Sequence, residues 1–150
     1  MKLEIAKKQD LEKIVSISKR AFETDVEVGG VKGDGPPDYD SISWHEQMQK
    51  EGHLYQATVG TVIVGGAVLF LSEDEEKLYI GRIFIDRMHH KKGYGLCLME
   101  LVENLFPNVK EINLDTPCWN VRTNSFYQKL KYKKIKQEDD FVFYQKQRNI

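Results

Sequence analysis

The sequence predicts an α/β fold with a mixed, largely antiparallel sheet flanked by helices, and three observations support this class. A chain of 150 residues is long enough to bury a core within one domain, which would span residues 1–150. Strand-like and helix-like periodicities follow one another in the order β-α-α-β-β-β-α-β-α-β-β. One βαβ crossover starts at the strand 77–85, and hairpins elsewhere make antiparallel neighbours.

The N-terminal segment predicts a short strand at 2–6, followed by two helices with a long loop between them. Asp10 is placed to cap the first helix, whose apolar face has helical spacing: Leu11, Ile14, Ile17, Ser18 and Ala21. Ser41 is placed to cap the second helix. The residues between the helices, 25–41, are rich in glycine and proline, and loops of this length often serve as lids or binding segments.

The middle of the chain predicts three strands and a helix. Residues 53–59 and 62–71 form a hairpin about Gly60-Thr61, and the strand 77–85 follows an acidic turn. A basic turn with two glycines leads into a helix that ends at Phe106-Pro107. We expect its apolar pattern to face the core, Cys97 included, with one side made by Leu98, Leu101, Val102 and Leu105.

The C-terminal segment predicts a strand at 111–116, a helix at 121–130 and a final hairpin. The hairpin strands are 133–136 and 141–145, and they turn about Glu138-Asp139-Asp140.

The turn His90-Lys-Lys-Gly-Tyr-Gly95 has the chemistry of an anion site. The first N–H groups of the helix behind it have no partner within the helix, and the helix dipole favours negative charge there. Glycines let the main chain come close to a ligand, and the two lysines add positive charge. The natural ligand is a phosphate or pyrophosphate, although a plain connecting loop would show the same local pattern.

Composition excludes several functional classes. The net charge is −1, so no overall field draws the chain to nucleic acid or to an anionic membrane. Basic residues cluster at 87–92 and at 129–136, and the second cluster is interpreted as a solvated face. The longest apolar run, 62–71, is too short to cross a bilayer. The four histidines have no metal-ligand spacing, so no metal is expected.

The compartment is predicted from the cysteines and from the first residues. Cys97 and Cys118 are the only cysteines in the sequence and have no CxxC spacing. Residues 1–5 lack the pattern of a signal peptide. Both observations favour a reducing cytoplasm.

Two motifs, in this order of elements, resemble the GNAT N-acetyltransferase superfamily over nearly the whole chain. The first runs from Ile83 to Gly95 and is similar to the family's fourth strand and pyrophosphate loop, Gln/Arg-x-x-Gly-x-Gly/Ala, with His90 at the Gln/Arg position. The second comprises Trp119-Asn120 and Ser125-Phe-Tyr-Gln-Lys-Leu-Lys-Tyr132, with Lys131 where the family commonly has glycine.

The resemblance implies a V-shaped opening between the fourth and fifth strands, which end near Ile85 and Thr116. Acetyl-CoA would lie in this opening as the co-substrate. Its pantetheine arm would pair with the main chain of Phe84 and Ile85. Its pyrophosphate would be bound by the loop residues His90, Lys91, Lys92, Gly93, Tyr94 and Gly95. Splayed strands expose unpaired N–H and C=O groups, which such an arm can satisfy.

The resemblance also assigns Tyr127 as the general acid that protonates the leaving thiolate. The alternative is a half-buried helix tyrosine that packs beside Phe126. Asn120 would reach the coenzyme arm by its side chain, and its position equally suits the N-cap of the helix 121–130.

The general base stays open at the level of sequence. Some relatives place a glutamate on the fourth strand, but this strand offers Tyr79, Gly81 and Arg82. Other acids in reach of the chemistry are Glu23, Asp25, Glu75, Glu76 and Asp115, and a water relay is a further alternative. We interpret Arg82 as a partner in a surface salt bridge or as a contact for an acidic acceptor.

The sequence therefore predicts an acyltransferase that moves an acetyl group from acetyl-CoA to an amine of a small molecule or peptide by direct attack. Residues 25–45 and 72–77 are expected to set the acceptor, with Tyr39 in its pocket and Trp44 in the core. The first alternative is a non-catalytic acyl-CoA sensor. The second is a nucleotide-binding regulatory domain, although the P-loop pattern is absent.

Expected partners other than the amine are limited to a second copy of the chain. Homodimers are common among proteins of this resemblance and size. The aromatic final strand, 141–144, is the one sequence feature that suggests such a contact.

Overall fold

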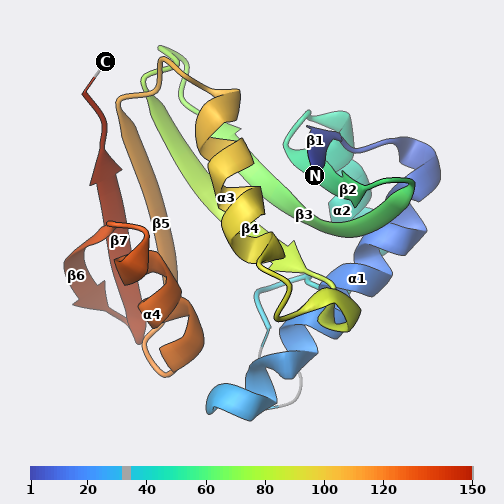
Figure 1. Ribbon diagram of the computed structural model, residues 1–150, viewed down its shortest axis with the longest axis horizontal. Helices are drawn as coiled ribbons and strands as arrows, with labels where there is room; N and C mark the ends of the chain where they lie inside the picture. The colour runs from blue at the N-terminus through green and yellow to red at the C-terminus, as the bar shows by residue number, and fades with distance from the viewer. Residues whose placement is uncertain (32–34, 150) are drawn as a thin grey trace.

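A computed structural model describes residues 1–31 and 35–149. Seven strands form one sheet in the order β1-β2-β3-β4-β5-β7-β6 (Figure 1). Neighbouring strands are antiparallel except β4 and β5, which are parallel. The strands are β1 (Lys2–Ile5), β2 (Leu54–Val59), β3 (Val62–Leu71), β4 (Lys77–Ile85), β5 (Glu111–Pro117), β6 (Lys133–Glu138) and β7 (Phe141–Gln147).

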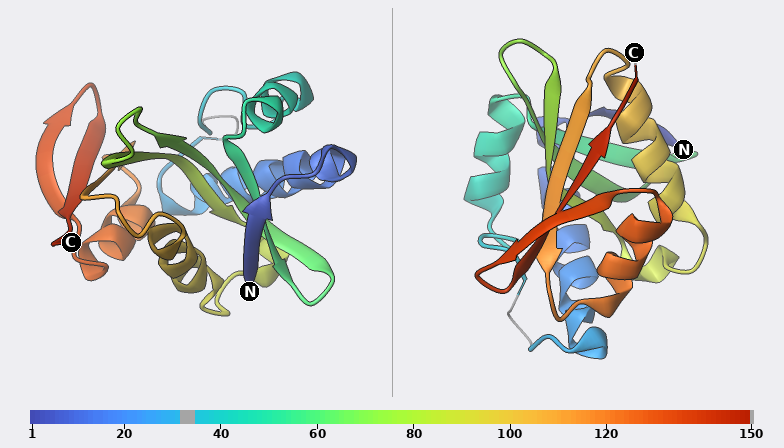
Figure 2. Two further views of the ribbon diagram at one scale, coloured as in Figure 1. Left: turned by 90° about the horizontal axis from the view of Figure 1, so that it is seen from above. Right: turned by 90° about the vertical axis from the view of Figure 1, so that its left-hand side faces the viewer.

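Helices cover both faces of the sheet (Figure 2). One face carries α1 (Leu11–Glu23) and α2 (Ile42–Lys50), whose apolar residues pack with Val68 and Phe84. The other carries α3 (Tyr94–Leu105) and α4 (Val121–Lys129), which pack on residues of β3, β4, β5 and β7. Short 3-10 turns connect the elements: η1 (Lys8–Asp10), η2 (Thr24–Val28) and η3 (Arg87–His89).

The parallel strands β4 and β5 are paired at one end only. Their register runs over three positions, from Lys77 with Glu111 to Tyr79 with Asn113. Beyond these positions the strands diverge (Figure 1), which confirms the predicted V-shaped opening. The edge of β4 from Ile80 to Ile85 therefore has no neighbouring strand on that side.

A β-bulge at Gly81 reverses which main-chain groups of β4 face the opening. The register of β4 against β3 shifts between Arg82 and Ile80, so Gly81 is the extra residue. Downstream, the N–H of Asp86 donates to the oxygen of Val64 on β3. Because antiparallel pairs alternate, Phe84 also directs its main-chain groups to β3, whereas Ile83 and Ile85 direct theirs into the opening.

The element order and most boundaries agree with the prediction from sequence. Ser41 accepts from the N–H of Trp44, as expected of a helix cap. The last hairpin turns at Asp139 and Asp140, both with positive φ, as a tight hairpin turn requires. Part of the loop prediction for 25–41 is replaced by η2, and residues 32–34 lie outside the described residues.

Two local predictions are wrong. Asp10 does not cap α1 with its side chain, because η1 already leads into the helix and the carboxylate instead accepts from Nε2 of Gln56 at 3.1 Å. Cys97 is exposed rather than in the core. The buried side of α3 runs through Leu98, Met99 and Val102, and Cys97 points away from it.

Candidate active site

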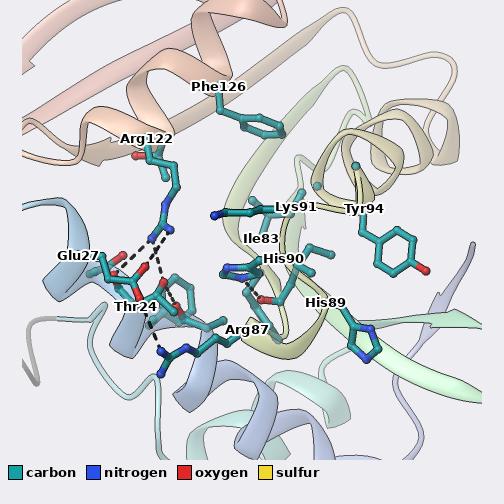
Figure 3. A pocket seen from close by; sticks show the side chains of 18 of the residues that line it. Thr24, Glu27, Ile83, Arg87, His89, His90, Lys91, Tyr94, Arg122 and Phe126 are labelled. Atoms are coloured by element: carbon teal, nitrogen blue, oxygen red, sulfur yellow. Dashed lines mark hydrogen bonds and ion pairs between the residues drawn. The ribbon is translucent and has the colours of Figure 1, made fainter.

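Two cavities meet at the opening between β4 and β5. We call the first the basic cavity; it has a volume of about 600 Å³ and lies between α1, β4, the loop before α3, and α4 (Figure 3). We call the second the mixed cavity; it has a volume of about 420 Å³ and is lined by α2, the residues 35–37, β4 and β5. Five residues line both cavities: Phe22, Asp25, Ile83, Thr123 and Tyr127.

The loop before α3 presents main-chain N–H groups to the basic cavity. Gly93 precedes α3 with φ +77°, and no side chain caps the helix. A Cβ at Gly93 would meet nothing within 4 Å, so the approach to the helix end is open. Lys91 also has a positive φ of 64°, which is uncommon for a residue other than glycine.

Arginine, lysine and histidine side chains gather around this cavity. Arg87, His89, His90 and Lys91 line it from the loop and Arg122 lines it from α4. Lys91 and Arg122 both point into the cavity (Figure 3). Of the predicted loop residues, Gly93, Tyr94 and Gly95 also line the cavity. Lys92 does not, and its Nζ lies 3.4 Å from Nδ1 of His89.

Arg122 belongs to this cluster and was not expected from the sequence. Its Nη2 donates to Oγ1 of Thr24 at 2.9 Å, and its Nη1 lies 3.7 Å from the carboxylate of Glu27. Arg87 pairs with the same carboxylate at 3.8 Å. The sequence offered one indication of this role: Arg122 lies two residues after Asn120, in the first turn of a predicted helix.

His90 is bound to the strand rather than free in the cavity. Its Nε2 donates to the main-chain oxygen of Ile85 at 2.7 Å, which fixes the ring and satisfies a carbonyl of the open edge. The N–H and C=O of Ile83 and the N–H of Ile85 then face the opening. The main-chain groups of Phe84 are directed to β3, so they do not offer the pairing expected of them, although Phe84 still lines the cavity.

Asp86 anchors the loop where it leaves β4. Its carboxylate accepts from Nε and Nη2 of Arg20 at 3.0 and 2.8 Å, and from the N–H of Met88 at 3.2 Å. The hydrogen bond from Arg20 holds the pKa of the Asp86 carboxyl below its ordinary value. The ion pair therefore ties the loop to α1.

Tyr127 lies at the junction of the two cavities. Its side chain is 6% exposed and packs against Phe126, Tyr132 and Tyr144. Burial first, and the charge of Asp115 second, raise the pKa of the Tyr127 phenol far above its ordinary value. A phenol is protonated at neutral pH even without this shift, so Tyr127 carries a proton that it can donate.

Asp25 is a half-buried acid at the same junction. Its Oδ1 accepts from Nδ2 of Asn120 at 3.4 Å. Burial raises the pKa of Asp25 to about 6, while the charge of Arg122 and the Asn120 hydrogen bond act in the opposite direction. Such a carboxylate is ionised at pH 7 yet can accept a proton readily.

Asn120 is the N-cap of α4, which confirms that interpretation. Its Oδ1 accepts from the N–H of Thr123 at 3.1 Å. The side chain is buried and lines the mixed cavity rather than the basic one. Both ends of its amide group are thereby used, by the cap and by Asp25.

The mixed cavity combines one guanidinium with carboxylates. Arg82 stacks on Trp44, with Cζ 3.9 Å from the ring centroid, and its Nη2 donates to the oxygen of Pro37. On the facing strand, Asp115 accepts from the hydroxyl of Tyr79 at 2.6 Å. Asp25 reaches the cavity at the junction. The expected surface salt bridge of Arg82 is absent among residues 1–31 and 35–149.

Other candidates from the sequence lie elsewhere. Glu75, Glu76 and the rest of the turn 72–77 line neither cavity, because this turn lies at the closed end of β4, where the strand is paired with β5. Tyr39 is buried against Phe22 and lines neither cavity. Trp44, by contrast, is half-buried at the edge of the core and lines the mixed cavity.

The described residues provide neither a metal-binding cluster nor a membrane-spanning helix. No group of three or more His, Cys, Asp or Glu side chains in the described part of the chain is arranged to hold a metal ion. No helix among those residues combines the length and apolar character needed to cross a membrane.

Comparison with known proteins identifies similar sequences and folds. The family model for the acetyltransferase (GNAT) family matches residues 11–132. No curated protein is significantly similar in sequence. The fold is similar to that of the PaiA N-acetyltransferase from Thermoplasma acidophilum, solved with coenzyme A, with a TM-score of 0.82, 15% identity and 98% of each chain covered.

Two further solved structures are similar over almost their whole length. A ribosomal-protein alanine N-acetyltransferase from Escherichia coli has a TM-score of 0.77 at 15% identity, with 99% of this chain and 94% of that chain covered. YncA from Salmonella typhimurium, a putative acetyltransferase solved with acetyl-CoA, has a TM-score of 0.71 at 17% identity, with 100% and 95% covered.

Proposed function

The chain belongs to the acetyltransferase (GNAT) family, and on this basis we propose that it transfers an acetyl group from acetyl-CoA to the amine of a small molecule or peptide. One observation carries the proposal. A basic cavity and a mixed cavity meet at the splay of β4 and β5, and they share a protonated phenol and an ionised carboxylate, Tyr127 and Asp25.

The basic lining of the first cavity supports coenzyme A, a polyanion, as its ligand. The N–H groups at the start of α3, with Lys91 and Arg122, would hold the diphosphate. The open edge of β4 at Ile83 and Ile85 would pair with the amides of the pantetheine arm. The structures of two similar proteins hold coenzyme A or acetyl-CoA, which supports this choice of co-substrate.

The residues at the junction have separate roles in the proposed reaction. Acetyl-CoA, when bound, supplies an activated acyl group as a thioester. Asp25 accepts a proton from the acceptor ammonium, so that the amine can attack. An N–H of the open β4 edge stabilises negative charge on the acyl oxygen. Tyr127 donates its proton to the departing sulfur, and the second proton lost by the attacking nitrogen restores the phenol.

Asp25 is preferred as the base over the other acids considered. It lines both cavities, whereas Asp115 lines only the mixed cavity and is already bonded to Tyr79. Glu23, Glu75 and Glu76 line neither. Its raised pKa also brings it close to the pH at which a general base is most effective.

The test is release of free thiol from acetyl-CoA in the presence of a panel of amines. We expect thiol release that depends on the amine and yields an acetylated product of the matching mass. Tight binding of acetyl-CoA with no turnover on any amine would instead support the alternative of a non-catalytic sensor. A cytoplasmic location and a homodimer stay predictions.

A further inference from the structure

The charge pattern of the mixed cavity restricts the acceptor, and we propose that the acceptor amine also bears a carboxylate, which Arg82 binds. The inference rests on the proposed function, because it names the substrate class of the same site. Three features of the cavity support it: Arg82 lacks a close ion pair, carboxylates line the same cavity, and the cavity volume is small.

Arg82 lies in the cavity wall without a close ion pair to a described residue, and the charge of Asp38 acts on it only from a longer distance. Its Nη2 donates to the oxygen of Pro37, and its Nη1 is buried without a hydrogen-bond partner among these residues. No described carboxylate lies within 4 Å of the guanidinium. A carbonyl offers only partial charge, and a half-buried guanidinium is best matched by a carboxylate. Burial lowers the pKa of Arg82 to about 10, and the charge of Asp38 opposes this shift only in part.

The same cavity is also lined by carboxylates that form no ion pair with Arg82. Asp25 and Asp115 provide carboxylates near Tyr127, where the acyl group would be presented. An ammonium would be attracted to these carboxylates and a carboxylate to Arg82. A molecule with both groups therefore matches the charges of the cavity.

Acceptors without an anionic group fit less well. A second ammonium beside Arg82 would meet a like charge, and an uncharged tail would leave the guanidinium unpaired. The volume of about 420 Å³ is near the lower end of the range of ~300–1,000 Å³ for small-molecule pockets. The cavity thus favours a free amino acid over a longer peptide.

Matched acceptor pairs test the proposal. Rates of thiol release from acetyl-CoA are measured with free amino acids and with their carboxamides, which keep the side chain and amine but lose the negative charge. A second pair compares dipeptides with free and amidated ends, and separates amino acids from peptides as the source of the carboxylate. We expect the acids to have kcat/KM values at least about 10-fold above those of the amides.

Variants assign the preference to Arg82. Arg82→Gln should lower kcat/KM for the acids about 10-fold or more and leave the amides nearly unchanged. An amino acid and its carboxamide differ in the pKa of the amine, which affects their rates. This difference is the same for both proteins, so it cancels when the acid-to-amide ratio of kcat/KM in the variant is divided by that in the wild type. Arg82→Lys keeps the charge but loses the planar fork, and should fall between the two. Lys50→Gln removes an exposed cation of α2, paired with Glu46 at 3.2 Å, and should change neither.

Three outcomes would overturn the proposal: no preference for acids in the wild type, a preference that survives in Arg82→Gln, or an equal loss for acids and amides. The last would mean that Arg82 only supports Pro37. If no acceptor is turned over, the proposed function fails instead. In that case, calorimetry on CoA-saturated protein measures the affinities of the same acids and amides. Tighter binding of the acids that is lost in Arg82→Gln would support the proposal, and any other result would overturn it.

Discussion

The basic and mixed cavities share one wall but differ in how they would bind a ligand. The basic cavity has three arginine or lysine side chains, Arg87, Lys91 and Arg122, together with free N–H groups at the start of α3. Among the described residues, the mixed cavity is lined by one arginine, Arg82, and no lysine, together with the carboxylates of Asp25 and Asp115. The first suits a large polyanion bound through the main chain, and the second suits a small ligand bound through side chains.

Both cavities depend on the same part of the sheet, the segment where β4 and β5 separate. Loss of pairing between β4 and β5 exposes the strand edge, and the bulge at Gly81 turns Ile83 and Ile85 toward the gap. Side chains on the two faces then set the charge of each cavity. Substitutions in the shared wall should therefore affect catalysis, whereas substitutions in one cavity should affect one ligand.

The largest effect is expected at the shared phenol. Tyr127→Phe removes the proton donor and should lower kcat by about 100-fold or more, with little change in the Kd for acetyl-CoA. Steady-state kinetics and calorimetry measure the two quantities. Tyr55→Phe, a half-buried tyrosine of β2 outside both cavities, is the matched control. An unchanged kcat in Tyr127→Phe would remove the acid role.

Titration of the shared carboxylate, Asp25, should cause the fall of kcat/KM at acid pH, here called the acid limb. Because Asp25 must be ionised to accept a proton, kcat/KM should be level above pH 7 and fall about tenfold per pH unit below about 6. Asp25→Asn should lower kcat by about 100-fold and abolish this limb. Glu23→Gln, two residues earlier and outside both cavities, is the control. A limb that persists in Asp25→Asn would assign the base elsewhere.

A moderate effect confined to the coenzyme is expected from the loop lysines. Lys91 lines the basic cavity and Lys92 does not. Lys91→Gln should raise the Kd for CoA about 10-fold, and Lys92→Gln should raise it much less. The Lys91 effect should shrink at high salt, since it is electrostatic. Equal losses in the two variants would contradict the placement of these side chains.

The smallest effect is a gain. Glu27 pairs with Arg87 and Arg122 at the rim of the basic cavity and would compete with a bound diphosphate. Its side chain is half exposed, so these ion pairs are weak. Glu27→Gln should lower the Kd for CoA by up to about fivefold. A weaker affinity in this variant would show that Glu27 organises the arginines rather than competing for them.

The sequence predicted most of the fold because its local signals are strong. The hairpin turn at Gly60, the cap at Ser41 and the glycine turn before α3 each fix an element boundary by local geometry. Asp10 and Cys97 were misjudged because a single position near a helix end or on its flank depends on tertiary packing.

The site was less predictable because it depends on long-range placement. The bulge at Gly81 changes which residues of β4 face the gap, and alternation counted along the strand cannot reveal this. Arg122 comes from α4 and meets η2 across 98 positions of sequence. The sequence could not select Asp25 from several candidate acids, because its selection depends on its position at the junction and on its burial.

The most direct test is an amide NMR titration of the protein with coenzyme A. The account predicts that the largest shifts occur at Lys92–Gly95 and at Ile83 and Ile85, with small shifts on the solvated strand β6. Saturating coenzyme A that leaves the amides of residues 92–95 unmoved would contradict the account, as would the largest shifts falling on β6.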